Sequence, residues 1–236
     1  MKAVTLFFLA LIGAALALVA VLRLLATDRP TRYDLIPSDD RNETLVVLVH
    51  GLTGRGPFEG AIKLAGKALH GADRLVIDYN AGPLSNTDPY AIANAIELAI
   101  HHTVSAGNYR EIVVLGHSAG AALVRKALMW GMGHEEDRER FGRKGKRPWV
   151  DRVVRFVSLA GINRGWSISP RPDNMTTGTY LQIWLGERLG RLSGSGKLSL
   201  GLRRGSPFIA DTRVQWIRIA RSDAVLEGRQ PFPQVI

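Results

Sequence analysis

The stretch VVLGHSAG, residues 113–120, decides the fold that we predict for this chain. Apolar β-formers run up to Gly116, a serine follows two residues later, and the helix formers AALVRKAL begin at residue 121. This order predicts a strand, a sharp turn and a helix, with Ser118 at the apex of a G-x-S-x-G motif. Glycines suit such a turn because a Cβ would clash where the backbone reverses. The amides and the dipole of the helix N-terminus then favour an oxyanion beside the Ser118 hydroxyl.

Alternating strand and helix patterns surround this turn. The apolar, β-rich runs 45–49 and 75–79 are typical of strands buried on both faces of a parallel sheet. Residues 58–69 and 88–105 are predicted helices, the second with Asp88 as its N-cap. This order indicates an α/β fold with a doubly wound, mostly parallel sheet. Further strands are predicted over 153–159 and 214–220, and a helical stretch is predicted at 180–185. This helical stretch lies inside the segment 167–211, which is either a lid or wall of the site or a surface excursion.

A glycine-rich loop, HGLTG at residues 50–54, follows the first of these strands. Its glycines allow the backbone to approach the serine turn closely. The amide of Leu52 is therefore a predicted oxyanion donor beside the amide of Ala119. A histidine fixed in such a loop more commonly hydrogen-bonds neighbouring backbone than takes part in catalysis, so we predict a structural role for His50.

The composition limits the classes of protein and of site. The 236 residues, 46% of them apolar, are enough for one domain with a core, and the absence of cysteine excludes disulfides and thiolate metal sites. We predict no cofactor and no metal. The formal charge of +10 divides into +1 for residues 1–128 and +9 for residues 129–236. This basic half is either a plain solvated face or a surface for anionic lipid headgroups. No basic helix, zinc pattern or aromatic RNA platform accompanies the charge, so nucleic acid is not a predicted partner.

The N-terminal segment is strongly apolar. Residues 3–22 carry no charge, and a helix of that length, at about 1.5 Å per residue, spans the roughly 30 Å hydrocarbon core of a bilayer. We therefore expect residues 1–23 to be a membrane anchor. The alternative is a signal peptide cleaved near Ala15-Leu16-Ala17, which would give a secreted protein, although such apolar regions normally have only about 7 to 15 residues. Residues 24–43 are predicted to be a polar tether, and residues 44–236 the folded domain.

Taken together, these motifs resemble the α/β-hydrolase superfamily, in particular its lipases and esterases. The resemblance rests on HGLTG at 50–54, on GHSAG at 116–120 and on Asp223 after a later predicted strand, and it covers roughly residues 44–228. Two lesser stretches, NRG at 163–165 and RGSPFI at 204–209, also look lipase-like. The resemblance implies that Ser118 is the nucleophile, that the Leu52 and Ala119 amides form the oxyanion hole, and that Asp223 is the acid that orients the base.

The general base does not follow the pattern of the family. Its members carry serine, acid and histidine in that order, but His134 is the only histidine after Ser118, and it precedes Asp223. No histidine follows Asp223, and a final strand is not evident. We expect that the 236 residues are a truncated version of a longer protein. The alternatives are that His134 substitutes as the base or that activity has been lost.

Two hypotheses for function follow from the sequence. The first is a membrane-anchored serine hydrolase that cleaves carboxylic esters, lipid-like ones in particular, through an acyl-enzyme on Ser118. The second is a catalytically silent, hydrolase-like binding or scaffold protein at the membrane. The sequence predicts neither the identity of the ester nor the oligomeric state.

Overall fold

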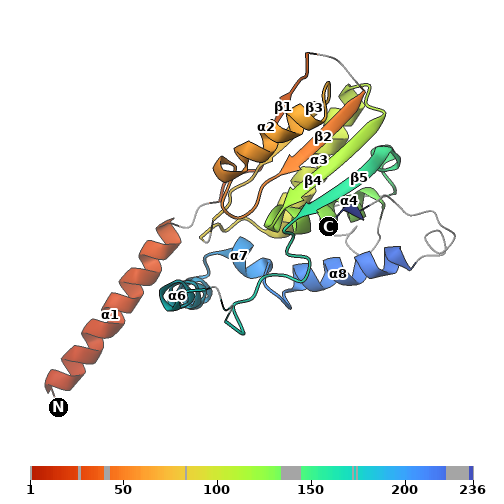
Figure 1. The fold of residues 1–236 in the computed structure, drawn as a ribbon. Coiled ribbons are helices and arrows are strands. Elements are labelled where there is room, and N and C mark those ends of the chain that lie inside the picture. Colours follow the sequence, from red (N-terminus) through yellow and green to blue (C-terminus); the bar gives the residue numbers. More distant parts are fainter. Residues whose placement is uncertain are drawn as a thin grey trace.

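The computed structural model describes residues 2–25, 28–39, 43–82, 84–133, 145–171, 173, 175–221 and 234–235. Its centre is a six-stranded sheet in the order β1-β3-β2-β4-β5-β6 (Figure 1). Four of the five neighbouring pairs are parallel, and β1 alone runs antiparallel to its neighbour β3. The strands are β1 (Arg32–Ile36), β2 (Thr44–Val49), β3 (Asp73–Asp78), β4 (Glu111–His117), β5 (Val153–Leu159) and β6 (Gln234–Val235).

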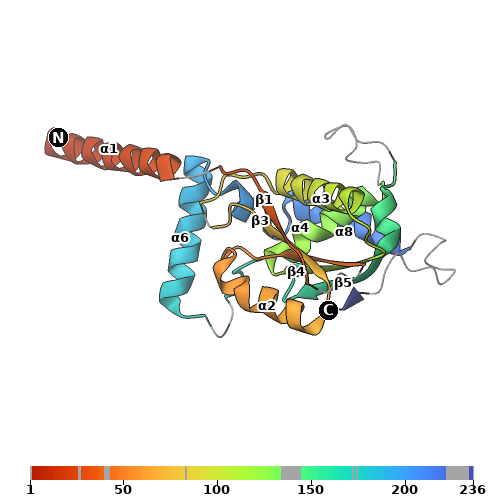
Figure 2. The same cartoon turned by 90° about the horizontal axis from the view of Figure 1, so that it is seen from above.

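Helices cover both faces of this sheet, as Figure 2 shows. On one face α3 and α4 pack against the sheet and share the larger core with it, and α8 packs on α4. On the other face α2 and the short 3-10 helix before it cover a smaller core around Val46, Leu48 and Ile62. The predicted α/β fold, with a mostly parallel sheet between helices, is confirmed. The helices are α1 (Lys2–Leu25), α2 (Glu59–Ala68), α3 (Pro89–Ala106), α4 (Ala119–Gly131), α6 (Thr177–Ser193), α7 (Lys197–Gly201) and α8 (Pro207–Ala220), with 3-10 turns at Gly56–Phe58 and Pro148–Arg152.

Local sequence explains the elements that were predicted correctly. Strand β2 has side chains that are buried on both faces from Leu45 to Val49, which accounts for its unbroken apolar run. Helix α3 begins where expected, because the Asp88 side chain accepts a hydrogen bond from the Tyr90 amide at 2.9 Å and Pro89 is the first helical residue. Helix α6 includes the helical stretch predicted at 180–185.

The strand predicted at 214–220 is wrong, because these residues belong to helix α8. The Ser206 side chain caps this helix by accepting a hydrogen bond from the Ile209 amide, and Pro207 follows as its first residue. Its buried positions, Phe208, Ile209, Thr212 and Gln215, repeat at the spacing of a helix. The β-branched and aromatic residues from Val214 onward are typical of a strand in composition, but the buried side chains recur at the spacing of a helix.

Two further predictions about the chain ends need correction. Residues 24–43 are not wholly a tether, because β1 (Arg32–Ile36) pairs along its length with β3 and extends the sheet. A final strand does exist, because β6 (Gln234–Val235) pairs in parallel with β5. Neither was visible in the sequence. The side chains of β1 are largely exposed, as suits an edge strand, and two residues are too short to show a period of two.

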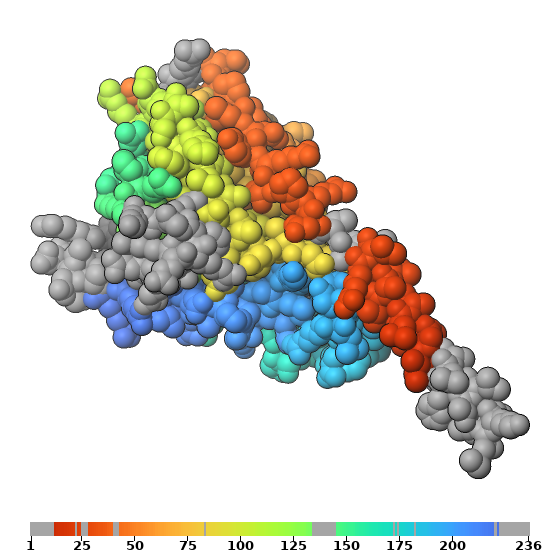
Figure 3. All heavy atoms as spheres, turned by 180° about the vertical axis from the view of Figure 1, so that it is seen from behind, coloured from red at the N-terminus to blue at the C-terminus, as the bar shows by residue number. Residues whose placement is uncertain are grey.

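Helix α1 extends away from the sheet as a rod and meets the rest of the molecule at α6 (Figures 1 and 3). The Arg23 guanidinium, near the C-terminal end of α1, donates a hydrogen bond from Nε to the Ser193 carbonyl oxygen at 2.7 Å. Within the described part of the chain, no helix combines the length and the apolar character needed to cross a membrane. The anchor predicted at residues 3–22 therefore receives no support from the structure.

The segment 167–211, predicted as a lid or a surface excursion, carries α6, α7 and the start of α8. In Figure 1 these helices lie across the end of the sheet at which the parallel strands finish. The segment between α4 and β5 is described only in part, because residues 134–144 lie outside the described ranges.

A buried polar pair joins α4 to α8 and provides a test of this packing. The Lys126 ammonium, on a fully buried side chain, donates to Gln215 Oε1 at 2.8 Å. We expect Gln215→Met to lower the free energy of unfolding by about 2 kcal/mol, because methionine has a volume similar to that of glutamine but leaves the buried ammonium without this acceptor. Urea denaturation of the full chain measures this change.

The matched control is Arg213→Met, which changes an exposed side chain on the same helix. It should alter the free energy of unfolding by no more than about 0.5 kcal/mol. Equal effects of the two substitutions would contradict the packing of α8 on α4.

Candidate active site

Ser118 occupies the turn between β4 and α4 in a strained conformation. Its φ of 51° and ψ of −115° lie in a region that residues with a Cβ avoid. The Ser118 amide donates to the Leu159 carbonyl oxygen at 2.8 Å, and the Ser118 carbonyl oxygen accepts from the amide of Ala121 at 3.2 Å. These bonds hold the turn from both sides. The sequence prediction of strand, sharp turn and helix is confirmed.

The two glycines of the motif are required by close backbone contacts. A Cβ on Gly116 would lie 2.5 Å from the Ala121 Cα, at the first turn of α4. A Cβ on Gly120 would overlap the carbonyl oxygens of Val49 and His50, at the end of β2. The start of α4 therefore packs closely against β4, which precedes it, and against the end of β2. These two contacts fix the direction of the helix axis.

The loop after β2 lies directly against Ser118. A Cβ on Gly51 would stand 3.1 Å from the Ser118 Cβ, and the Gly54 amide closes the loop by donating to the Gly51 carbonyl oxygen at 3.1 Å. Leu52 follows Gly51, and Ala119 is the first residue of α4. Among the described residues, neither the Leu52 amide nor the Ala119 amide has a hydrogen-bond acceptor. Both donors that the sequence predicted thus come from segments that border Ser118.

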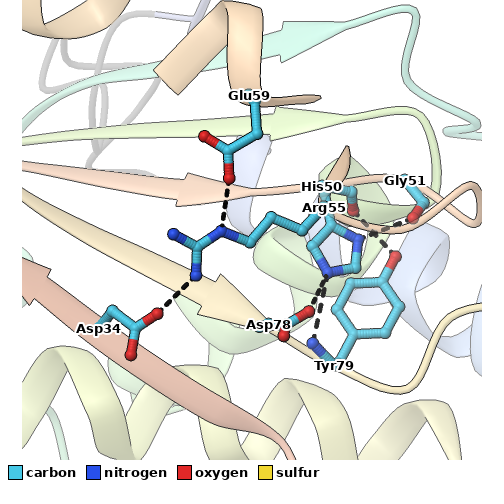
Figure 4. Close-up of polar contacts among 7 residues, drawn as sticks. All are labelled: Asp34, His50, Gly51, Arg55, Glu59, Asp78 and Tyr79. Atoms are coloured by element: carbon cyan, nitrogen blue, oxygen red, sulfur yellow. Dashed lines mark hydrogen bonds and ion pairs between the residues drawn. The ribbon is translucent and has the colours of Figure 1, made fainter. Parts of the chain in front are cut away.

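His50 holds this loop in place, as Figure 4 shows. Its ring is fully buried, stacks on the Tyr79 ring at 4.2 Å between centroids, and bonds the Gly51 carbonyl oxygen through Nδ1 at 2.8 Å. The Tyr79 hydroxyl donates to the His50 carbonyl oxygen at 2.8 Å. Burial, and to a smaller extent the Asp78 carboxylate, raises the pKa of the Tyr79 phenol, so this donor keeps its proton. The structural role predicted for His50 is confirmed.

The described residues do not test the catalytic triad that the resemblance implies for Ser118. No hydrogen bond joins the Ser118 hydroxyl to a histidine within the described ranges. Both His134 and Asp223 lie outside those ranges. The reason for choosing Asp223 has also weakened, because it was expected to follow a strand and the residues before it form helix α8.

A third loop supports the turn, and sequence reasoning gave it no such role. After β5, Ala160 has a φ of 46°, and the Ile162 amide donates to the Ser118 carbonyl oxygen at 3.4 Å. A Cβ on Gly161 would overlap the Ser158 hydroxyl and would lie 2.9 Å from the Ala121 Cβ. The NRG stretch at 163–165 was the available signal for this loop.

An apolar cavity continues from this third loop. It has a volume of about 310 Å³ and is lined by Leu84, Trp166, Ile183 and Leu200, by Glu187, and by glycines and serines of α6, of α7 and of the turn between them. The Trp166 indole is fixed by a hydrogen bond from Nε1 to the Ser199 carbonyl oxygen at 2.7 Å. The volume lies in the lower part of the range for sites that bind small molecules. The segment 167–211 therefore forms a wall at the site end of the sheet.

Comparisons with known proteins agree with this arrangement. Residues 98–186 match the family model described as Lipase (class 2), a stretch that contains β4, Ser118, α4 and β5. The mature form of the lipase BlEst2 from Bacillus licheniformis superimposes with a TM-score of 0.54 at 16% identity, over 87% of this chain and 71% of that one. The propeptide form of the same lipase gives a TM-score of 0.55 at 16% identity, over 87% of this chain and 38% of that one. The fold is similar to that of these two lipase structures. No curated protein sequence matches the chain.

The close contact at Gly120 leads to a prediction about the stability of the protein. We expect Gly120→Ala to lower the free energy of unfolding by about 2 to 3 kcal/mol, because the added methyl group overlaps two carbonyl oxygens of β2. Gly60→Ala on α2 is the matched control, since a Cβ there meets nothing within 4 Å. That control should change stability by at most about 1 kcal/mol, towards greater stability. Chemical denaturation compares the two, and similar values would refute the close contact.

The structural role of His50 leads to a second prediction. His50→Ala removes a buried, hydrogen-bonded ring, and we expect it to lower the free energy of unfolding by about 2 to 4 kcal/mol. The control His102→Ala changes an exposed histidine on α3 and should have an effect within about 0.5 kcal/mol. If His50→Ala left stability intact and removed only catalysis, His50 would be a catalytic residue and our assignment would be wrong.

Proposed function

We propose that the protein is a serine hydrolase that cleaves carboxylic esters through an acyl-enzyme on Ser118. The observation that carries this proposal is the strained Ser118, with a φ of 51°, at a turn bordered by two backbone amides without acceptors among the described residues. Ordinary turns use glycine in such conformations, whereas a serine there presents a hydroxyl at the mouth of the site. The match of residues 98–186 to Lipase (class 2) supports the same chemistry.

In this mechanism the Ser118 Oγ attacks the carbonyl carbon of the ester while a base takes its proton. The electron pair of the carbonyl bond moves onto oxygen, and the Leu52 and Ala119 amides stabilise that oxyanion. When the carbonyl re-forms, the alcohol leaves with the proton from the base, and the acyl group stays on Ser118. Water then attacks the acyl-enzyme by the same route and releases the acid. The predicted acid, Asp223, and the alternative base, His134, lie outside the described residues and stay predictions.

The apolar cavity supports a lipid-like ester as the substrate class. The cavity of about 310 Å³ exposes mostly apolar surface, and its charged lining residue, Glu187, is ion-paired with Arg191 and Arg203. Such a cavity suits an alkyl or acyl chain better than a polar group. Attachment to a membrane through residues 3–22 belongs to this proposal and rests on the sequence alone.

The second candidate is a silent binding or scaffold protein with the same turn. It is favoured by one observation, namely that no histidine in the described part of the chain is hydrogen-bonded to the Ser118 hydroxyl. Without a base, an oxyanion hole and substrate binding still accelerate hydrolysis by about 10³ to 10⁴ over water.

Labelling with a fluorophosphonate probe separates these two candidates. We expect the full chain to be labelled and Ser118→Ala to remain unlabelled, because the probe reacts with an activated serine hydroxyl. Ser105→Ala is the matched control, since Ser105 is exposed on α3 with its Oγ 3.5 Å from His101 Nδ1 but has no strained turn. Labelling that survives in Ser118→Ala and disappears in Ser105→Ala would reject the proposal, and a chain that is never labelled would favour the scaffold.

Ester hydrolysis then tests the base. On a short-chain nitrophenyl ester we expect the 236-residue chain to be a very weak esterase, with kcat at least about 10²-fold below that of a complete triad. Full turnover that His134→Ala abolishes would instead identify His134 as the base. Full turnover that no histidine substitution alters would exclude the triad.

A further inference from the structure

A second cavity, with a volume of about 480 Å³, lies at the end of β3 beside the loop of residues 50–54, which carries the predicted donor Leu52 and is called the oxyanion loop below. Its lining comes from Gly54 of that loop, from Tyr79 and Asn80 after β3, and from the segment that leads into β1. That segment contributes two arginines, Arg29 and Arg32. The segment after β3 borders both cavities, because it contributes Tyr79 and Ala81 to the lining of this one and Leu84 to the lining of the apolar one.

The two arginines lack carboxylate partners. Within the described ranges, neither the Arg29 nor the Arg32 side chain makes an ion pair or a hydrogen bond. Two acidic residues of this region, Asp34 and Glu59, are engaged by another arginine, because Arg55 binds Asp34 at 2.5 Å and Glu59 at 2.9 Å (Figure 4). The guanidinium groups on the cavity therefore keep their donors for a bound molecule.

One carboxylate does face this cavity, and it limits the positive charge. Asp78 is the cross-strand neighbour of Arg32 and lines the same space, so the lining carries a net charge of +1. Its Oδ1 lies 3.1 Å from His50 Nε2, so this oxygen already has a partner in the buried ring. An anion beside the two arginines would thus meet more positive than negative charge.

The arginines are held by the fold on both sides. Arg32 opens β1, which pairs with β3 over its whole length. Just before Arg29, the Asp28 carboxylate accepts a hydrogen bond from the buried Thr87 hydroxyl at 3.0 Å. The segment between these two anchors therefore has a defined position next to the oxyanion loop.

We propose that the cavity bounded by Arg29 and Arg32 binds an anionic phosphate group of the ester substrate, while the apolar cavity binds its hydrocarbon chain. This inference rests on the proposed ester hydrolysis at Ser118 and names the substrate class: an amphiphilic ester with a phosphate on its alcohol side. Arginine suits this ligand because its planar donors bind two phosphate oxygens at once. Because Ala81 and Leu84 of one short segment line the two cavities, a single amphiphilic molecule would occupy both.

Paired substrates test this proposal in the full chain. The butanoyl ester of glycerol phosphate and the butanoyl ester of glycerol differ only in the phosphate, so the ratio of their kcat/KM values isolates its contribution. We expect the wild type to prefer the phosphate ester, and the double substitution Arg29→Gln with Arg32→Gln to reduce the ratio by about tenfold or more.

The matched control is Arg110→Gln, which removes one positive charge at the opposite end of the sheet, where Arg110 pairs with Glu43 at 2.6 Å. This control should leave the ratio unchanged. A ratio that the double substitution does not lower, or that Arg110→Gln lowers as much, would overturn the phosphate site.

Binding to the Ser118→Ala variant decides the proposal separately from hydrolysis. If the wild type cleaves neither ester, the proposed enzymatic function fails, but calorimetry still measures the affinity for the phosphate ester. Affinity that falls about tenfold with the two arginine substitutions would support the site, and equal affinity would overturn it. Inorganic phosphate serves as the second probe, since binding as tight as that of the ester would reject a substrate headgroup in favour of free phosphate.

Discussion

The structure depends on the contact between the first turn of α4 and the end of β2. A Cβ at Gly120 would overlap two carbonyl oxygens there, so the helix can start only where the backbone carries no side chain. This contact sets where α4 lies on the sheet, and α4 in turn supports α3 and α8. The loop after β2 also lies close to Ser118, since a Cβ added to Gly51 would stand only 3.1 Å from the Ser118 Cβ. The fold and the candidate site are therefore consequences of one backbone approach.

The parts of the fold that the sequence predicted are those that local chemistry determines. Strand β5 was predicted at its observed bounds, Val153–Leu159, and α3 begins at Asp88 and Pro89, because a buried strand and a capped helix leave dense local signals. The turn at Ser118 and the structural role of His50 were predicted because their motifs are short and local in the sequence. The contacts that these motifs make nevertheless reach across the chain, from Gly120 to Val49 and from His50 to Tyr79.

The parts that the sequence did not predict depend on partners far along the chain. Strand β1 is mostly exposed, and only its pairing with β3 makes it a strand. Residues 214–220 have the composition of a strand, but contacts such as Lys126 with Gln215 hold them as a helix against α4. The cavity beside the oxyanion loop joins residues 29–32 to residues 54 and 78–81, and no local pattern announces it.

The strain at Ser118 helps to choose between an enzyme and a silent scaffold. A non-glycine residue at a φ of 51° costs about 1 to 3 kcal/mol, and the contacts of β2, β5 and α4 are what maintain it. Glycine at position 118 would make the same turn without strain and would serve a scaffold equally well. The Ser118 hydroxyl has no hydrogen-bond partner among the described residues. In the proposed mechanism a reacting ester is its partner, so the strain at Ser118 agrees better with the proposed hydrolase than with the scaffold.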